Sequence, residues 1–311
     1  MKKTLLLIIA AFLGIAACKD TGKQSAEQAA SEQPMAKPVV YASNYPLYYF
    51  AKRIGGGQID LHFPPAEMSD PSGWTPAADT VAAMQQADLI LLNGASYEGW
   101  LMNVSLPDSL LVDTSESFTG QLLPSGETVT HSHGEEGEHA HEGTAYTTWL
   151  NLSLATKQAN AVKEAMGRIR PDLKDAFEIN YLEIAAELEE LDNAFREVAA
   201  ASPDTYLVFS HPVYQYFQDA YGLQGQSLHW EPETSMDHDR LHEIGHLKQD
   251  HNFRYLIWEG EPKTETMEEL NTRGVQSVVL DPMSGTPASG DFIQGMRQNL
   301  KVLSEMLGQQ P

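Results

Sequence analysis

The stretch PDLKDAFEINYLEIAAELEELDNAFREVAAAS, residues 171–202, decides the fold. Pro171 stands at a favourable first-turn position of a helix, and neither glycine nor proline follows it within the stretch. Apolar residues recur at steps of three and four, at Leu173, Phe177, Tyr181, Ile184, Leu188, Leu191 and Phe195. This spacing predicts one amphipathic helix of roughly 45 Å. Such a helix is long for a connector inside one domain, and it indicates a rigid spine between two lobes with a ligand cleft between them.

On both sides of this stretch, short β-rich runs alternate with helical segments. Before it we expect strands at 39–43, 59–64 and 87–94 and helices at 45–56 and 77–87; after it we expect strands at 205–210, 255–260 and 275–282 and helices at 213–222 and 239–250. Strands that alternate with helices predict parallel sheets covered by helices on both faces. The predicted fold class is therefore α/β, with an N-terminal lobe at 38–170, a linker helix at 171–202 and a C-terminal lobe at 203–311.

The N-terminus has the pattern of a secretory signal. Two lysines precede an apolar run from Leu5 to Ala17, which is shorter than the about 20 residues that span a bilayer. The run ends in Ile15-Ala16-Ala17-Cys18, which resembles the lipobox of bacterial lipoproteins, and Cys18 is the single cysteine of the chain. We predict a signal peptide at 1–17, lipidation of Cys18 and a flexible polar tether at 18–37. This places the protein in the bacterial cell envelope, held to the membrane by its lipid alone.

The acidic balance excludes one class of partner. The full chain has a formal net charge of −23, which becomes −25 when the leader takes Lys2 and Lys3 away. Such a surface repels nucleic acid and anionic lipid and attracts cations. We therefore expect no nucleic-acid partner.

A histidine-rich segment at 126–146 interrupts the alternation of strands and helices. It holds His131, His133, His139 and His141 among glutamates and glycines, with almost no apolar content. No core can be built from such a composition, so the segment predicts an exposed mobile loop. Imidazole and carboxylate groups together are ligands for zinc-like cations. The loop is therefore a candidate collector of metal ions, with a solvated low-complexity insert as the alternative.

Six motifs in order make residues 38–311 resemble the zinc and manganese solute-binding proteins of bacterial ABC transporters. They are YPLYYFAKRIGG (45–56), DPSGWTP (70–76), ADLILLNGASYEGWL (87–101), TTWLNLS (147–153), SHPVYQYFQDAYGL (210–223) and VVLDPMSG (278–285). The resemblance implies two pseudo-symmetric α/β lobes bridged by one long helix, with a metal held at the lobe interface.

The metal ligands that the resemblance implies are only partly present. His211 and Asp281 match the two ligands of the second lobe, whereas Ser72 and Thr147 stand where the family has histidines in the first lobe. Hydroxyls are poor zinc donors compared with imidazole or carboxylate. Either water completes a weak site, other side chains replace the missing ligands, or the protein no longer binds a metal in the way of the family. Candidate replacements are His139 and His141 from the loop, Glu259 at the end of the 255–260 strand, and Asp70.

The sequence HEIGH at 242–246 has the two-histidine, one-glutamate pattern of zinc peptidases. On a helix, His238, His242 and His246 lie close to one face. The longer metzincin pattern is absent, because Gln249 and Asn252 stand where it has glycine and histidine. We therefore expect no enzyme here, and at most a secondary surface metal site on these three histidines.

Together these features predict a lipid-anchored receptor, monomeric, that captures a divalent metal and hands it to an ABC permease. Zn²⁺ is the expected ligand and Mn²⁺ the alternative. Two other functions stay open, a receptor of the same fold for a non-metal or chelated ligand and a surface adhesion lipoprotein.

Overall fold

Two four-stranded parallel sheets form the framework in the computed structural model, which describes residues 36–68, 70–132 and 138–308. The first sheet contains β1 (Val39–Ala42), β2 (Asp60–His62), β3 (Leu89–Leu92) and β4 (Leu111–Asp113), in the order β2-β1-β3-β4. The second contains β7 (Tyr206–Phe209), β8 (Gln224–Ser227), β9 (Tyr255–Trp258) and β10 (Gln276–Val279), in the order β10-β9-β7-β8. Both sheets thus place their strands in the same second-first-third-fourth order. This repetition confirms the predicted α/β class and the pseudo-symmetry of the lobes.

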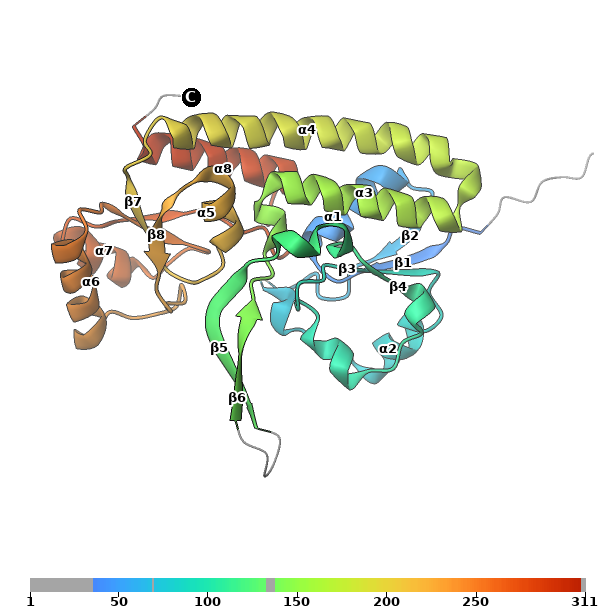
Figure 1. The fold of residues 1–311 in the computed structure, drawn as a ribbon, viewed down its shortest axis with the longest axis horizontal. Coiled ribbons are helices and arrows are strands. Elements are labelled where there is room, and N and C mark those ends of the chain that lie inside the picture. The colour runs from blue at the N-terminus through green and yellow to red at the C-terminus, as the bar shows by residue number, and fades with distance from the viewer. Residues whose placement is uncertain (1–35, 69, 133–137, 309–311) are drawn as a thin grey trace, which may run out of the picture. The chain divides into compact units, whose positions relative to one another are not determined.

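Helices follow the strands in both halves (Figure 1). They are α1 (Tyr45–Gly55), α2 (Ala78–Met84), α3 (Leu152–Ile169), α4 (Lys174–Ala200), α5 (Gln215–Tyr221), α6 (His238–Asp250), α7 (Thr264–Thr272) and α8 (Phe292–Met306). The starts of several are fixed by polar caps: the side chain of Asn44 accepts a hydrogen bond at the start of α1, and Asp237 and Asp291 do the same for α6 and α8.

The predicted spine is present as α4. It has 27 residues, so it is about 40 Å long, and it begins just after a short 3₁₀ turn at Pro171–Leu173. Its apolar face is buried, and it packs against α1 and α3 of the first half and against α5 and α8 of the second (Figure 1). One hydrophobic core therefore continues through both halves. From Lys37 onward the chain forms one compact unit, and the predicted boundaries at 170 and 202 stay a prediction.

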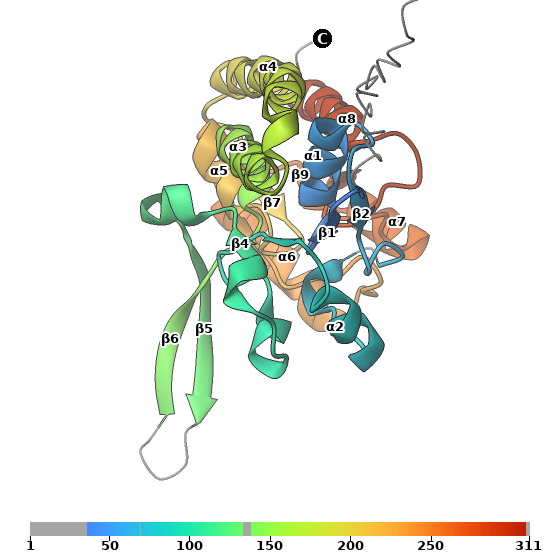
Figure 2. The ribbon, with the colours of Figure 1, turned by 90° about the vertical axis from the view of Figure 1, so that its right-hand side faces the viewer.

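The histidine-rich segment is a hairpin, which corrects the loop prediction. β5 (Pro124–Ser132) and β6 (Glu138–Thr144) pair antiparallel, with His131 opposite His139 along the backbone. Figures 1 and 2 both show this hairpin projecting away from the sheets. The low apolar content of the segment predicts a loop, but it does not exclude strands that pair with each other. The β-branched run Thr128-Val129-Thr130 favours extended backbone, and cross-strand pairing satisfies the main-chain hydrogen bonds without a core.

Two strands of the sheets, β4 and β8, were missed by the sequence analysis. β8 has the sequence QGQS, which carries no β-branched or aromatic residue, and it lies at the edge of its sheet. Gly225 explains this composition, because a Cβ atom at that position would lie 2.0 Å from the carbonyl oxygen of Leu207. The strand thus forms through close backbone approach, which a hydrophobic pattern does not reveal.

The predicted signal peptide, Cys18 and the tether up to residue 35 lie outside the described residues. Among the helices that the structure describes, none has both the length and the apolar character needed to cross a bilayer.

Candidate metal centre

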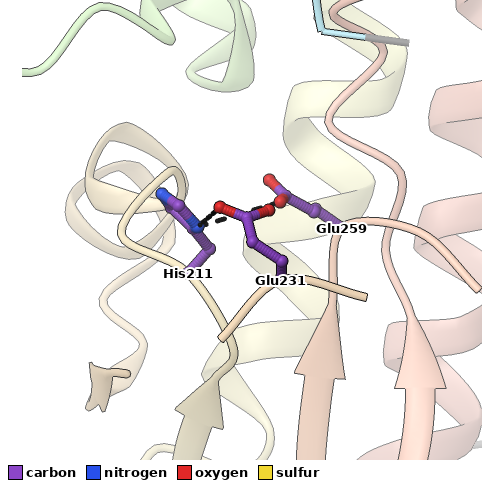
Figure 3. A group of neighbouring side chains, drawn as sticks. All are labelled: His211, Glu231 and Glu259. Atoms are coloured by element: carbon purple, nitrogen blue, oxygen red, sulfur yellow. Dashed lines mark ion pairs between the residues drawn. The ribbon is translucent and has the colours of Figure 1, made fainter. Parts of the chain in front are cut away.

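Three side chains converge at the carboxyl ends of the second sheet (Figure 3). His211 follows β7, Glu231 follows β8 and Glu259 follows β9 directly. Each offers one ligand atom, and these atoms lie within 4.8 Å of one another. Nδ1 of His211 lies 3.0 Å from Oε1 of Glu231 and 3.9 Å from Oε1 of Glu259. One imidazole and two carboxylates gathered in this way are a donor set for a divalent cation.

The topology of the sheet explains why the group forms at this place. In an open parallel sheet, ligands bind beyond the carboxyl ends of the strands at the point where the strand order reverses. Here that point lies between β7 and β9, which are neighbours in the sheet although β8 separates them in the sequence. His211 and Glu259 are the residues that leave these two strands. Their proximity is therefore a consequence of the fold.

The electrostatics of the group favour an incoming cation. Glu259 is partly buried, and its burial together with the nearby carboxylate of Glu231 raises the pKa of Glu259 to about 8. The charges of Asp70 and Glu233 make smaller contributions that also raise the pKa of Glu259. Asp70 belongs to the first lobe, so its charge acts on this group across the interface between the lobes, here called the seam. A divalent cation bound here would relieve this repulsion and take the place of the proton on Glu259.

His211 itself has a nitrogen available for a ligand. Its Nδ1 atom is buried and makes no hydrogen bond of good geometry, despite the 3.0 Å contact with Glu231. A buried imidazole nitrogen without a hydrogen bond is costly in a finished core. A metal ion between the imidazole and the carboxylates satisfies this nitrogen, so the residues present fit a cation.

At the carboxyl ends of the strands of the first sheet, buried amide side chains occupy the equivalent place. Asn44 follows β1 and Asn93 follows β3, and both side chains are fully buried. The side-chain amide of Asn44 donates to Oδ1 of Asn93 (3.1 Å), and Nε2 of Gln158 donates to the same oxygen (3.0 Å). These strand ends are thus occupied by a hydrogen-bond network, and the described residues form no group of three metal ligands there.

The two first-lobe positions that lack histidine have structural contacts. The hydroxyl of Thr147 is buried and donates to the carbonyl oxygen of Val213 across the seam between the lobes (2.6 Å). The hydroxyl of Ser72 donates to Oδ2 of Asp70 (2.7 Å). Thr147 therefore joins the lobes, and Ser72 is bonded to the first-lobe carboxylate whose charge acts on Glu259.

Asp281 is not part of the group of three. Its Oδ1 atom accepts a hydrogen bond from the backbone N–H of Met283 (2.7 Å), and it lines a groove of about 330 Å³ with residues of α7, β10 and α8. The role of Asp281 as a ligand stays a prediction that the resemblance made.

The base of the hairpin adjoins the centre. Ser125 and Thr144 line a cavity of about 80 Å³ together with Tyr146, Thr147 and His211. His133 lies outside the described residues, and of His131, His139 and His141 only the strand backbone is described. Their predicted contribution to the site therefore stays a prediction.

The histidines of HEIGH lie elsewhere, on the exposed face of α6. Nε2 of His246 and Nε2 of His242 are 3.2 Å apart, whereas the carboxylate of Glu243 accepts a hydrogen bond from the indole of Trp230 (3.1 Å). Among the described residues, this pair belongs to no group of three metal ligands. The motif therefore lacks the third protein ligand and the free glutamate that zinc peptidases use.

The family model described as the zinc-uptake complex component A, periplasmic, matches residues 40–306. The chain belongs to the ZnuA family. This confirms the resemblance drawn from the six motifs. Among its relatives, the zinc-binding lipoprotein AdcA of Streptococcus pneumoniae is 27% identical over 323 residues, covering 100% of this chain and 62% of AdcA. The high-affinity zinc uptake system protein ZnuA of Bacillus subtilis is 26% identical over 330 residues, covering 97% of each chain.

Solved structures of the ZnuA family have the same fold. The crystal structure of Zn(II)-bound AdcA from Streptococcus pneumoniae superposes with a TM-score of 0.76 at 23% identity, covering 88% of this chain and 59% of that one. This chain therefore spans less than two thirds of the length of AdcA.

Glu231 is the member of the group that sequence reasoning missed. It belongs to His229-Trp230-Glu231, which follows β8, and β8 itself gave no sequence signal. The one available signal was an imidazole and a carboxylate two residues apart in the same half as His211. His229 lies close by, with its ring centroid 6.4 Å from that of His211.

Proposed function

We propose that this protein captures Zn²⁺ and delivers it to an ABC uptake transporter, without bond-making chemistry of its own. The observation that carries the proposal is the convergence of His211, Glu231 and Glu259 at the point between β7 and β9 where the strand order of the second sheet reverses. The names of the relatives AdcA and ZnuA, which describe zinc binding and zinc uptake, support Zn²⁺ over Mn²⁺.

In this proposal one lobe supplies the whole imidazole and glutamate set. His211, Glu231 and Glu259 all come from the second sheet, while the first lobe contributes the negative charge of Asp70. Water or Asp70 completes the four-coordinate shell that zinc prefers. The lobes are already joined by hydrogen bonds at the seam, so the ligand set exists without a large closing motion.

The remaining parts of the proposal concern the cell. The hairpin collects ions through its histidines, Cys18 carries the lipid that holds the monomer at the outer side of the membrane, and a permease with its ATPase accepts the metal. A neighbouring gene for such a permease is the cheapest observation that supports this assignment.

The test is a competition titration of zinc against a chromophoric chelator, with metal analysis of the purified protein. We expect His211→Ala, Glu231→Gln and Glu259→Gln each to weaken zinc binding by more than about 100-fold, above the loss typical of an outer-sphere partner. Asp281→Asn is the matched control, since it removes a carboxylate that the family resemblance implies and the observed group lacks. A large loss in Asp281→Asn with little loss in Glu231→Gln would contradict the proposed ligand set.

The hairpin is tested separately by deleting residues 130–143. The proposal expects equilibrium affinity at the centre to persist while capture at low zinc becomes slower. If the wild-type protein binds no zinc at all, that result would instead favour a receptor for a chelated ligand or a surface adhesion protein.

A further inference from the structure

Helix α6 carries a pair of histidines that the zinc-capture proposal does not use. His242 and His246 are one helical turn apart, both exposed, and their Nε2 atoms are 3.2 Å apart. The two ring planes are inclined at 79° and the ring centroids are 4.2 Å apart. Two imidazole nitrogens therefore lie side by side on the exposed face of the helix.

The separation of the two nitrogens matches metal chelation. With metal–nitrogen bonds of about 2.0–2.1 Å, two coordinating nitrogens lie about 2.9 Å apart at a tetragonal angle and about 3.3 Å apart at a tetrahedral angle. The observed distance of 3.2 Å lies between these two values, so a small adjustment of the rings brings the pair to either geometry. A direct hydrogen bond between the rings gives a similar distance, so the two interpretations must be separated by experiment.

The backbone beneath the pair is well fixed. Asp237 caps the start of α6 by accepting a hydrogen bond from the backbone N–H of Arg240 (2.9 Å). Ile244 and Leu247, on the opposite face, are buried in a core with Trp230 and Trp258. Because the helix is held in this way, the two imidazoles are brought together before a ligand arrives, which reduces the entropy cost of binding.

The pair leaves most of the coordination sphere open. No third histidine, cysteine, aspartate or glutamate joins it to make a three-ligand group within the described part of the chain. His238 lies one turn earlier, with its ring centroid 6.3 Å from that of His242, and it is close to Asp239. Sites with two nitrogen donors and water in the other positions suit tetragonal Cu²⁺ and Ni²⁺, and bind Zn²⁺ more weakly.

We propose that His242 and His246 form a second metal site, an exposed two-imidazole chelate for hydrated divalent transition metals with the affinity order Cu²⁺ above Ni²⁺ and Zn²⁺. The site is separate from the group at His211, because no residue is shared and α6 presents the pair on its solvent face. The protein thus binds one further metal ion per chain, and this binding does not depend on the zinc site at His211.

The probe is CuCl₂ alone, added to full-length protein in a background that removes the competing ligands. This background carries the substitutions His211→Ala, His131→Ser, His133→Ser, His139→Ser and His141→Ser. We expect one equivalent of Cu²⁺ to bind, with nitrogen hyperfine splitting from two imidazoles in the paramagnetic resonance spectrum. Either His242→Ala or His246→Ala should weaken this binding by about 100-fold, because each removes one arm of a chelate.

His251→Ala is the matched control. His251 follows the same helix, but its ring stacks on Tyr206 at a centroid distance of 3.8 Å, so copper binding should not change. A background protein that binds no copper, or copper binding that survives both substitutions in α6, would show that the rings only share a hydrogen bond. In otherwise unaltered protein, His246→Ala should leave zinc binding at His211 intact, which keeps this test distinct from that of the uptake function.

Discussion

The indole N–H of Trp149 donates a hydrogen bond of 2.7 Å to the carbonyl oxygen of Pro282, and so joins the first lobe to the turn that carries Asp281. The backbone N–H of Tyr45 reaches the carbonyl oxygen of Ser284 in the same turn (3.4 Å). Further hydrogen bonds cross the seam, among them the bond from Thr147 to Val213. The lobes are thus held together beside the metal centre by contacts that need no metal.

Loss of the Trp149 bond should destabilise the protein. In Trp149→Phe, the carbonyl of Pro282 stays buried without its donor, and such a loss costs about 1–3 kcal/mol. Trp258→Phe is the control, because the indole nitrogen of Trp258 is buried and makes no hydrogen bond, while the change in ring size is the same. Urea unfolding should therefore show a larger fall in the free energy of unfolding for Trp149→Phe. Equal losses would mean that ring volume alone matters.

Zinc binding should depend on pH through Glu259. Its pKa is raised from 4.5 to about 8, so at neutral pH the metal displaces a proton from this carboxyl group. Zinc affinity should therefore rise as the pH increases toward about 8 and then level off. In the metal-free protein the sign is opposite: the folded state binds this proton more tightly than the unfolded state, so the contribution of Glu259 to stability is lost between about pH 4.5 and pH 8.

Calorimetry in buffers of different ionisation enthalpy measures the protons released per zinc. Glu259→Gln should release fewer protons per zinc than the wild type. Glu231→Gln removes a nearby carboxylate that raises the pKa of Glu259, so the residual zinc affinity should level off at lower pH. An unchanged number of protons in Glu259→Gln would exclude Glu259 as the titrating ligand.

The sequence predicted most of the architecture because its main signals are local. The spacing from Phe177 to Phe195 is enough to define α4, and apolar runs such as Leu89–Leu92 define central strands. β8 was not predicted, because this edge strand contains Gly225 and has no alternation of apolar and polar residues. The loop prediction for the hairpin was wrong for a different reason, since hydrogen bonding between backbone groups alone can order a segment of polar residues.

Prediction of the centre was limited by the same edge strand. His211 and Glu259 follow strands that the sequence reveals, and the position of Glu259 at the end of such a strand makes it a candidate replacement ligand. Glu231 depends on the position of β8, without which the segment from Leu228 to Glu231 cannot be placed in the sheet. Which side chains converge where the strand order reverses depends on the order of the strands in the sheet, and no local sequence pattern encodes that order.

Restoring the first-lobe histidines should have opposite effects at the two positions. Ser72 is partly exposed and close to Tyr146, whose hydroxyl lies 3.4 Å from Oγ of Ser72 and whose residue lines the cavity with His211. Ser72→His should add an imidazole donor and tighten zinc binding by at least about tenfold. Thr147 is only 2% exposed and bonded to Val213, so Thr147→His should overpack the seam and cost about 1–3 kcal/mol.

Zinc titration and urea unfolding of both variants separate these effects. Ser72→Ala serves as the control for loss of the hydroxyl, since it removes the bond to Asp70 without supplying a nitrogen. If Ser72→His binds zinc no more tightly than Ser72→Ala, position 72 does not face the metal.

Glu98 gives the first lobe a second pH dependence, which is separate from metal binding. Its carboxylate is buried and accepts hydrogen bonds from the backbone N–H groups of Asn93 (2.6 Å) and Gly94 (3.2 Å). Burial outweighs these bonds and raises the pKa of Glu98 from 4.5 to about 7. Because the folded state holds this proton more tightly, the contribution to stability is complete below about pH 4.5 and is lost as the pH rises through 7, by about 3 kcal/mol in total.

Glu98→Gln tests this, because glutamine is the amide analogue of the protonated acid and does not titrate. The wild type should lose more unfolding free energy than Glu98→Gln between about pH 5 and pH 8, by an amount near the predicted 3 kcal/mol. Glu259 titrates in both proteins, so its effect cancels in the comparison. Parallel pH profiles for the two proteins would show that Glu98 is ionised throughout, and that the two backbone N–H groups stabilise its charge more than burial destabilises it.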